Sequence, residues 1–238
     1  MKILSIDCSA GPASVAVSED GKILASSFVN VKLTHSETLM PMVESTLSAA
    51  LLNFGDIEGI AVNHGPGSFT GIRIGIAAAK GLAAPRSLPC VGVSTLLSMA
   101  YNYSDTDCIV CAVMDARCNQ VYNALFEVEN GRITRLTGDR AILCEELAED
   151  LKKVSQNTEK CVIIVGDGTE VFYPFARDIA NVRKSGVNNR YQNAASVGLA
   201  ARELFENSNT VSPDKLLPIY LRLPQAEREL KKKKEGNL

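Results

Sequence analysis

The first 29 residues alternate between hydrophobic and polar side chains, which is the pattern of half-buried strands. This alternation predicts strands over residues 2–7, 13–18 and 22–29. The Asp20-Gly21 pair between the last two is a strong hairpin signal, because both residue types tolerate the backbone of a tight turn. From residue 34 the apolar spacing becomes helical, and Thr34 with Glu37 three residues later forms a capping box. The chain is therefore predicted to begin as an antiparallel meander followed by a helix.

An apolar run over 57–62 predicts a buried strand that ends at the Gly65-Pro-Gly67 turn. A helix follows over about 70–83, then a short strand over 90–93 and a helix that begins at Ser94.

The second half of the chain repeats this order. The pattern predicts strands over 108–115, 120–128 and 132–136, a helix over 145–154, a strand over 161–165 and a helix over 194–206. Each half is thus three antiparallel strands, a helix and another strand. We therefore predict a duplicated α/β unit, with an N-terminal lobe over 1–103 and a C-terminal lobe over 104–238 that ends in a frayed basic tail at Lys231–Lys234.

Small residues recur along one side of the 70–83 helix, at Gly71, Gly75 and Ala79. Each glycine costs roughly 1 kcal/mol of helix propensity relative to alanine, so we expect close approach of another helix to offset that cost. A glycine turn before a helix can also bind an anion. The spacing is not that of a phosphate loop, and the packing interpretation is the simpler one.

Composition excludes several classes of protein. The net charge is -2 over 238 residues, so no global basic field exists for direct RNA binding. Seven cysteines without a regular framework indicate a reducing compartment, and we expect a cytoplasmic protein with no membrane span. Cys108 and Cys111 form a CxxC, but a strand points them to opposite faces, so buried packing is favoured over redox or zinc chemistry.

Polar residues follow the strands that open each half. Asp7 ends the first strand and Ser9 follows it. Asp115 ends the matching strand of the second half, and Gly166-Asp167 lies at the end of a later strand. In a duplicated α/β fold these ends face a cleft where a nucleotide and magnesium are commonly held, so they are candidates for weak ATP or ADP binding. The alternative is that they only form turns.

His35 and His64 are the two histidines of the chain, and neither has another histidine at helical spacing. A metal site on one helix face requires such a pair. We therefore predict no metal and no catalytic histidine, with local hydrogen bonding as the role of both.

Several motifs together resemble one known family. They are Ile6-Asp7-x-Ser9, His35-Ser-Glu37, Gly65-Pro-Gly-Ser-Phe-Thr-Gly-Ile-Arg-Ile-Gly75, Ala79-Lys-Gly81, Gly92-Val-Ser-Thr-Leu96, Asp115-Ala-Arg117 with Val121-Tyr122, and Tyr220-Leu-Arg222. On these residues the chain resembles the bacterial TsaB (YeaZ) family, an accessory protein of tRNA threonylcarbamoyladenosine (t6A) synthesis. The resemblance implies a two-lobe, actin-like, sugar-kinase-like ATPase (ASKHA) fold. Cys8 departs from the threonine usual in the family.

The resemblance also implies partners. In the family the N-terminal lobe binds a TsaD-type transferase. A TsaE-type ATPase joins through that complex, and contact with tRNA is expected only within it. The transferase has a His-x-x-x-His metal motif where this chain has Thr95 and Met99. Neither replaces an imidazole ligand, so we expect a non-catalytic scaffold.

The implied interface is a helical bundle, which we expect to become a homodimer interface when the chain is alone. Its expected residues are His35, Leu39, Met42, Val43, Thr46, Gly71, Ile72, Gly75 and Ala79. A bulky residue at Gly75 is then expected to abolish the complex and leave the monomer folded.

Two other functions stay open. One is a glycoprotease-like peptidase, which needs a metal or nucleophile site that the sequence does not show. The other is a small-molecule kinase of the same fold, which would use Asp7 and Asp115 around magnesium-ATP.

Overall fold

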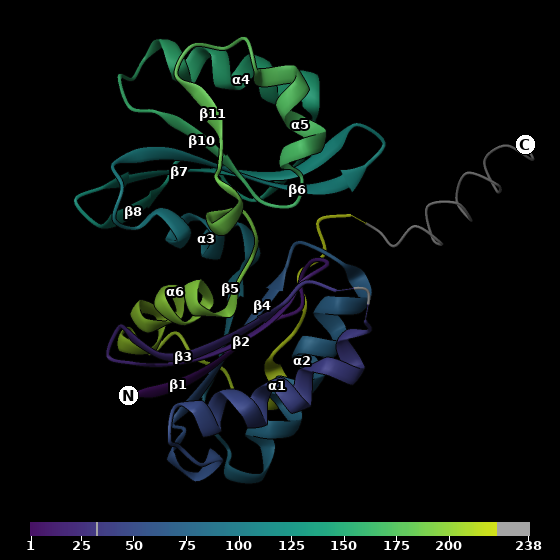
Figure 1. Cartoon of the computed structure of the whole chain (residues 1–238), viewed down its shortest axis with the longest axis vertical. Coiled ribbons are helices and arrows are strands. Elements are labelled where there is room, and N and C mark those ends of the chain that lie inside the picture. Colours follow the sequence, from purple (N-terminus) through teal and green to yellow (C-terminus); the bar gives the residue numbers. More distant parts are fainter. Residues whose placement is uncertain (32, 223–238) are drawn as a thin grey trace, which may run out of the picture.

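The computed structural model describes residues 1–31 and 33–222, which form two α/β lobes joined side by side (Figure 1). The predicted basic tail at Lys231–Lys234 lies outside the described residues.

The sheet of the first lobe has five strands in the order β3-β2-β1-β4-β5. Their bounds are β1 (Lys2–Asp7), β2 (Ala13–Glu19), β3 (Lys22–Val29), β4 (Gly59–Gly65) and β5 (Cys90–Ser94). Strand β1 pairs antiparallel with β2 and parallel with β4. The turn between β2 and β3 places Asp20 and Gly21 at φ angles of 51° and 86°, as a primed hairpin turn requires, which confirms the predicted hairpin.

The second lobe repeats this order with its own strands. Their bounds are β6 (Cys108–Arg117), β7 (Gln120–Glu129), β8 (Arg132–Arg135), β9 (Arg140–Leu143), β10 (Val162–Val165) and β11 (Val182–Lys184). The sheet runs β8-β7-β6-β10-β11, with β9 also paired to β7. Position by position this matches β3-β2-β1-β4-β5. The repeated order confirms the duplicated, two-lobe ASKHA fold.

Helices cover both faces of the first sheet. Helices α1 (His35–Ala49) and α2 (Phe69–Ala83) pack on one face, against core residues such as Leu4 and Val15. Helix α6 (Ala194–Glu206) packs on the other face, against Ile3 and Ala61.

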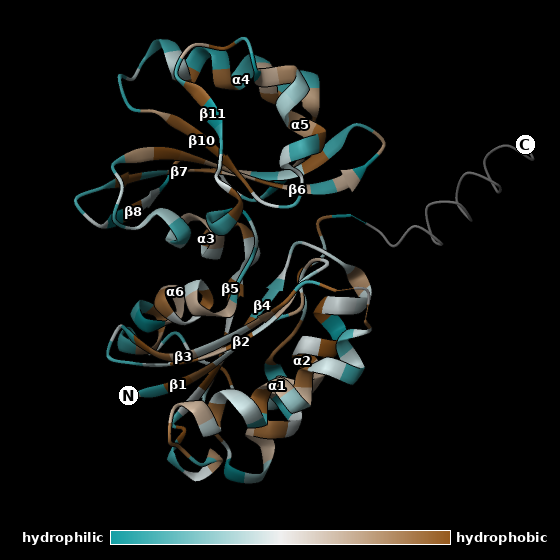
Figure 2. Ribbon diagram, viewed as in Figure 1, coloured by the Kyte–Doolittle hydropathy of each residue, from teal (hydrophilic) through white to brown (hydrophobic). Residues whose placement is uncertain are grey.

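The second sheet is covered in the same way. Helices α4 (Cys144–Gln156) and α5 (Thr169–Ala176) lie on its outer face. Helix α3 (Thr95–Ala100) lies on its inner face, so that α3 and α6 fill the layer between the two sheets (Figure 1). Figure 2 shows that the central strands are mostly hydrophobic, whereas polar residues gather on the outward sides of the helices. Cys108 and Cys111 are buried on opposite faces of β6, as predicted.

The predicted boundary between the lobes is wrong for the end of the chain. Helix α6 packs on the first sheet, and its first amide, from Ala194, donates to Ser14 Oγ at 3.0 Å. Beyond it, Val211 bridges to β5 and Leu216 is buried in the core beneath α1 and α2. The first lobe therefore contains two separate stretches of the chain, and the second lobe is inserted between them.

Candidate functional site

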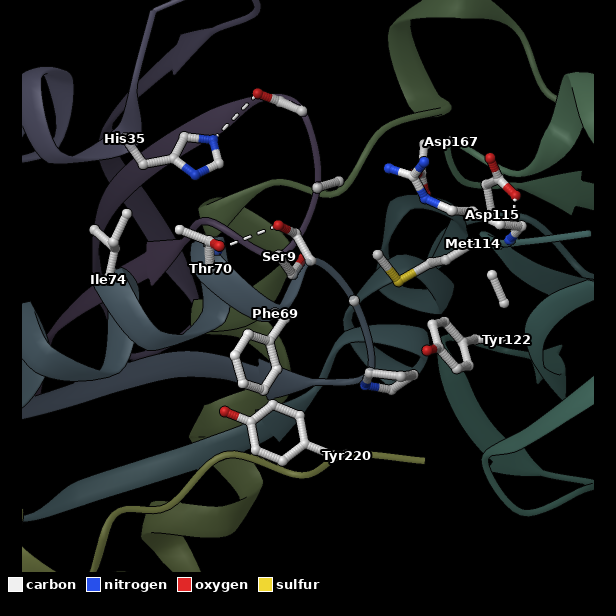
Figure 3. Close-up of a pocket in the computed structure, with 18 of the residues that line it drawn as sticks. Ser9, His35, Phe69, Thr70, Ile74, Met114, Asp115, Tyr122, Asp167 and Tyr220 are labelled. Carbon is white, nitrogen blue, oxygen red and sulfur yellow. Dashed lines mark hydrogen bonds between the residues drawn. The ribbon is translucent and has the colours of Figure 1, made fainter. Parts of the chain in front are cut away.

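A cleft of about 1160 Å³ separates the two lobes. The first lobe contributes the β1–β2 loop, the chain just before α1 and the start of α2. The second lobe contributes the β6–β7 hairpin and the end of β10. Residues 216–222, which we call the strap, contribute their last four residues to its wall (Figure 3).

Three of the five predicted nucleotide-site residues line this cleft. They are Ser9, Asp115 and Asp167, which come from both lobes (Figure 3). Asp7 lies beneath the surface, 1 % exposed, where its carboxylate accepts the Ser9 amide at 2.8 Å. Gly166 is also buried, and its φ of 115° and the nearby Val113 carbonyl leave no room for a side chain. Asp7 and Gly166 therefore shape the strand ends from below.

Burial governs the charge of the carboxyl groups around the cleft. It raises the pKa of Asp167 to about 6, although the amide of Gln192 donates to that carboxylate at 2.7 Å. Burial also raises the pKa of Asp7. Asp7 and Asp167 therefore ionise at a higher pH than exposed aspartates do.

Asp167 is expected to make stability depend on pH. Between about pH 4 and pH 6 the folded state holds a proton that the unfolded state has lost, so wild-type stability falls as the pH rises through this window. Asp167→Asn removes the buried charge and keeps an oxygen for Gln192. The free energy of unfolding at pH 7.5 should rise by about 1–2 kcal/mol, with the gain vanishing near pH 4.

Urea unfolding at three pH values would measure this effect. Asp178→Asn, at a carboxylate that is 90 % exposed on the same lobe, is the control and should change little. Equal stability of wild type and Asp167→Asn at pH 7.5 would contradict the assignment.

The two histidines make local contacts. The His35 Nε2–H donates to the Gly11 carbonyl at 3.2 Å, which ties the start of α1 to the β1–β2 loop. Burial lowers the pKa of His64, whose ring occupies the space left by the missing side chain of Gly92. Within residues 1–31 and 33–222, no three histidine, cysteine or acidic side chains gather as metal ligands would.

A cluster of aromatic and arginine side chains borders the cleft, and the sequence did not predict it. Phe69 and Tyr220 stack with ring centroids 4.9 Å apart. Arg73 lies 3.9 Å from the Phe69 centroid, and its Nε donates to the Tyr220 hydroxyl at 2.8 Å. Arg222 donates to the Ala116 carbonyl at 2.7 Å. Two of the quoted motifs contain these residues, Phe69 and Arg73 in the first and Tyr220 and Arg222 in the second, but neither motif indicated that they meet.

The structure corrects the predicted interface residues. Most of them are in the core of the first lobe, at most 6 % exposed, and face its own sheet: Leu39, Met42, Val43, Thr46, Ile72 and Ala79. An amphipathic helix buries its apolar stripe first against its own domain. These side chains are therefore unavailable to a partner, and His35 contacts the β1–β2 loop instead.

Gly71 and Gly75 of α2 also face inward, toward the end of β1 and the neighbouring β4. A side chain at Gly71 would collide with the Cys8 carbonyl, and one at Gly75 would begin 3.4 Å from Val62 and 3.5 Å from Cys8. A bulky residue at Gly75 would extend into this core, so we now expect it to destabilise the monomer as well.

The opposite sides of the same two helices are exposed. On α1 they present Met40, which is 41 % exposed, together with Glu44 and Ser48. On α2 they present Ala77 and Gly81, and nothing lies within 4 Å of a side chain built at Gly81. We call these five residues the outer helix face. It combines one apolar and one acidic residue with three small ones, and small residues allow a second helix to come close.

Thr95 and Met99 lie on α3 and are fully buried between the sheets. All seven cysteines are unpaired thiols in the described chain. No helix among the described residues combines the length and hydropathy needed to cross a bilayer.

Comparison with known proteins identifies the family. A family model described as "TsaD: tRNA N6-adenosine threonylcarbamoyltransferase" matches residues 24–230. The "tRNA threonylcarbamoyladenosine biosynthesis protein TsaB" of Escherichia coli is 32% identical over 232 residues, covering 97% of this chain and 98% of that protein. The protein of the same name from Bacillus subtilis is 30% identical over 227 residues, covering 95% and 96%.

A solved structure agrees with these relatives. A Pseudomonas aeruginosa protein described as similar to peptidase YeaZ superposes with a TM-score of 0.78 at 25% identity, covering 93% of this chain and 99% of that one. The match over the whole length, with the repeated sheet order, leads to one conclusion: the chain belongs to the TsaB (YeaZ) family.

Proposed function

We propose that this protein is an accessory subunit in the synthesis of t6A at adenosine 37 of tRNA. The observation that carries the proposal is the match, over almost the whole of both chains, to relatives named for threonylcarbamoyladenosine biosynthesis. A cytoplasmic location, where tRNA is modified and cysteines stay reduced, fits the seven free thiols.

The protein acts in this proposal as a non-catalytic scaffold. Thr95 and Met99 occupy the positions that resemble the transferase's metal-binding histidines, and both are buried in the layer between the sheets. A threonine hydroxyl and a thioether do not make the imidazole site of that motif. The transfer of the threonylcarbamoyl group to N6 of the adenosine then belongs to a TsaD-type partner.

The outer helix face is the proposed docking surface for that partner. Ala77 and Gly81 let a second pair of helices come close, and Met40 supplies an apolar contact. A TsaE-type ATPase joins through the complex, and the same face makes a homodimer when the partner is absent. With a net charge of -2, the chain meets tRNA through the complex.

Reconstitution of t6A synthesis from purified components tests the proposal. Unmodified tRNA is incubated with the transferase, the ATPase, threonylcarbamoyl-adenylate and its supply enzymes, with and without this chain. Mass spectrometry of the nucleosides then measures the product. We expect omission of the chain to remove the product, whereas equal yields in both reactions would reject the accessory role.

A further inference from the structure

The strap, residues 216–222, touches both lobes within a few residues. Leu216 is 2 % exposed in the core of the first lobe. The Ile219 amide then donates to the His64 carbonyl at 2.7 Å, so the strap continues along the end of β4. The close passage of the Ile219 carbonyl is why Gly65 has no room for a side chain. From there the last four residues of the strap line the wall of the cleft.

Within the strap, Tyr220 holds the chain to α2. Tyr220 stacks on Phe69 (Figure 3). Arg73 covers the Phe69 ring and donates to the Tyr220 hydroxyl. A stacked pair with a cation on one ring and a hydrogen bond to the other is specific in geometry. This anchor holds the strap against the first turns of α2.

The last residue of the strap, Arg222, contacts the second lobe. Arg222 donates to the Ala116 carbonyl at the end of β6. The next three residues, Arg117, Cys118 and Asn119, have φ angles of 63°, 56° and 55°, an uncommon run for residues that are not glycine. The bond from Arg222 therefore reaches the hairpin just before a tight turn at the cleft.

The two chain segments that connect the lobes are held together at Asn102, away from the strap. The Asn102 side chain donates to the carbonyls of Asn189 and Tyr191, at 3.1 Å and 3.0 Å, and accepts from the Asn193 amide at 2.9 Å. This network binds the outgoing crossover to the returning one. Neither crossover lines the cleft near the strap, so a pivot at Asn102 and a tie at Arg222 act at different places.

We propose that the strap is a latch on the cleft. The Tyr220 cluster fixes it to the first lobe, and the hydrogen bond from Arg222 to Ala116 holds the second lobe closed against it. The lobes open about the crossovers when Arg222 leaves the Ala116 carbonyl. One charged hydrogen bond is expected to bias the closed state by roughly tenfold.

Hydrogen exchange and small-angle X-ray scattering on the full chain test the latch. Arg222→Ala should speed amide exchange in residues 115–120 by roughly tenfold and increase the radius of gyration. Arg222→Lys keeps a charged donor and should restore slower exchange. Tyr220→Ala removes the other anchor and should give the same change in the hairpin. Arg177→Ala, at an exposed arginine that pairs with its neighbour Asp178, should change neither readout.

Two results would overturn the proposal. Unchanged exchange of the hairpin in Arg222→Ala would show that the bond does not hold the lobes. Faster hairpin exchange without an increase in the radius of gyration would show that Arg222 stabilises only the β6–β7 turn and does not hold the lobes together. Neither result depends on the proposed function, because both measurements use the isolated chain.

Discussion

Replacing Ala77 by arginine should abolish binding to the TsaD-type transferase and leave the fold intact. Ala77 is exposed in the middle of α2, so a long side chain there extends into solvent in the free protein. In a close helix contact the same side chain would stand between the two backbones and bury an unpaired charge. We expect at least a hundredfold loss of affinity, corresponding to about 3 kcal/mol, and loss of t6A in the reconstituted reaction.

Titration calorimetry with the purified transferase would measure the affinity, and circular dichroism would verify the fold. Ala141→Arg is the matched control, because Ala141 is an exposed alanine on β9 of the second lobe. It should bind like wild type. Full affinity of Ala77→Arg would place the interface elsewhere. Equal losses of affinity in both variants would show that an added arginine weakens binding at either position, so the loss would not identify the outer helix face as the interface.

The same small substitution at two glycines of α2 should have opposite effects on stability. Gly71→Ala places a methyl group against the backbone carbonyl of Cys8, which cannot move aside as the end of a flexible side chain would. We expect a loss of at least about 3 kcal/mol in the free energy of unfolding. Gly81→Ala meets nothing within 4 Å and should gain up to about 1 kcal/mol from helix propensity.

Urea unfolding of the two variants beside wild type would measure both changes. A stable Gly71→Ala variant would show that α2 can shift away from β1. If Gly81→Ala weakens partner binding while it stabilises the free chain, the result would support a contact between the partner and the outer helix face at Gly81.

Periodicity predicted most elements but not which surface each one covers. The helix over 194–206 was predicted with the correct bounds and assigned to the wrong lobe, because an amphipathic pattern does not name the sheet on which it packs. The apolar stripe of α1 and α2 was mistaken for a partner surface for the same reason. The hydrophobic pattern did not predict α5, β9 or β11. Both of these strands have four residues or fewer, which is too short for an alternation to stand out.

The cleft was predictable in part. Ser9, Asp115 and Asp167 follow strands that end at facing edges of two related sheets, so topology brings them together. The contact between Arg73 and Tyr220 could not be found from spacing, because the two residues are 147 positions apart. Burial, which decided the roles of Asp7 and Gly166, also required the structure.

The split first lobe has a consequence for synthesis on the ribosome. The sheet that emerges first has one apolar face, around Ile3 and Ala61, which α6 covers. Helix α6 leaves the ribosome only after the whole inserted lobe has been made. The nascent chain must therefore carry an uncovered hydrophobic surface through the synthesis of the second lobe. The lobe that starts first is the last to be completed, and its exposed hydrophobic surface is open to chaperones during that interval.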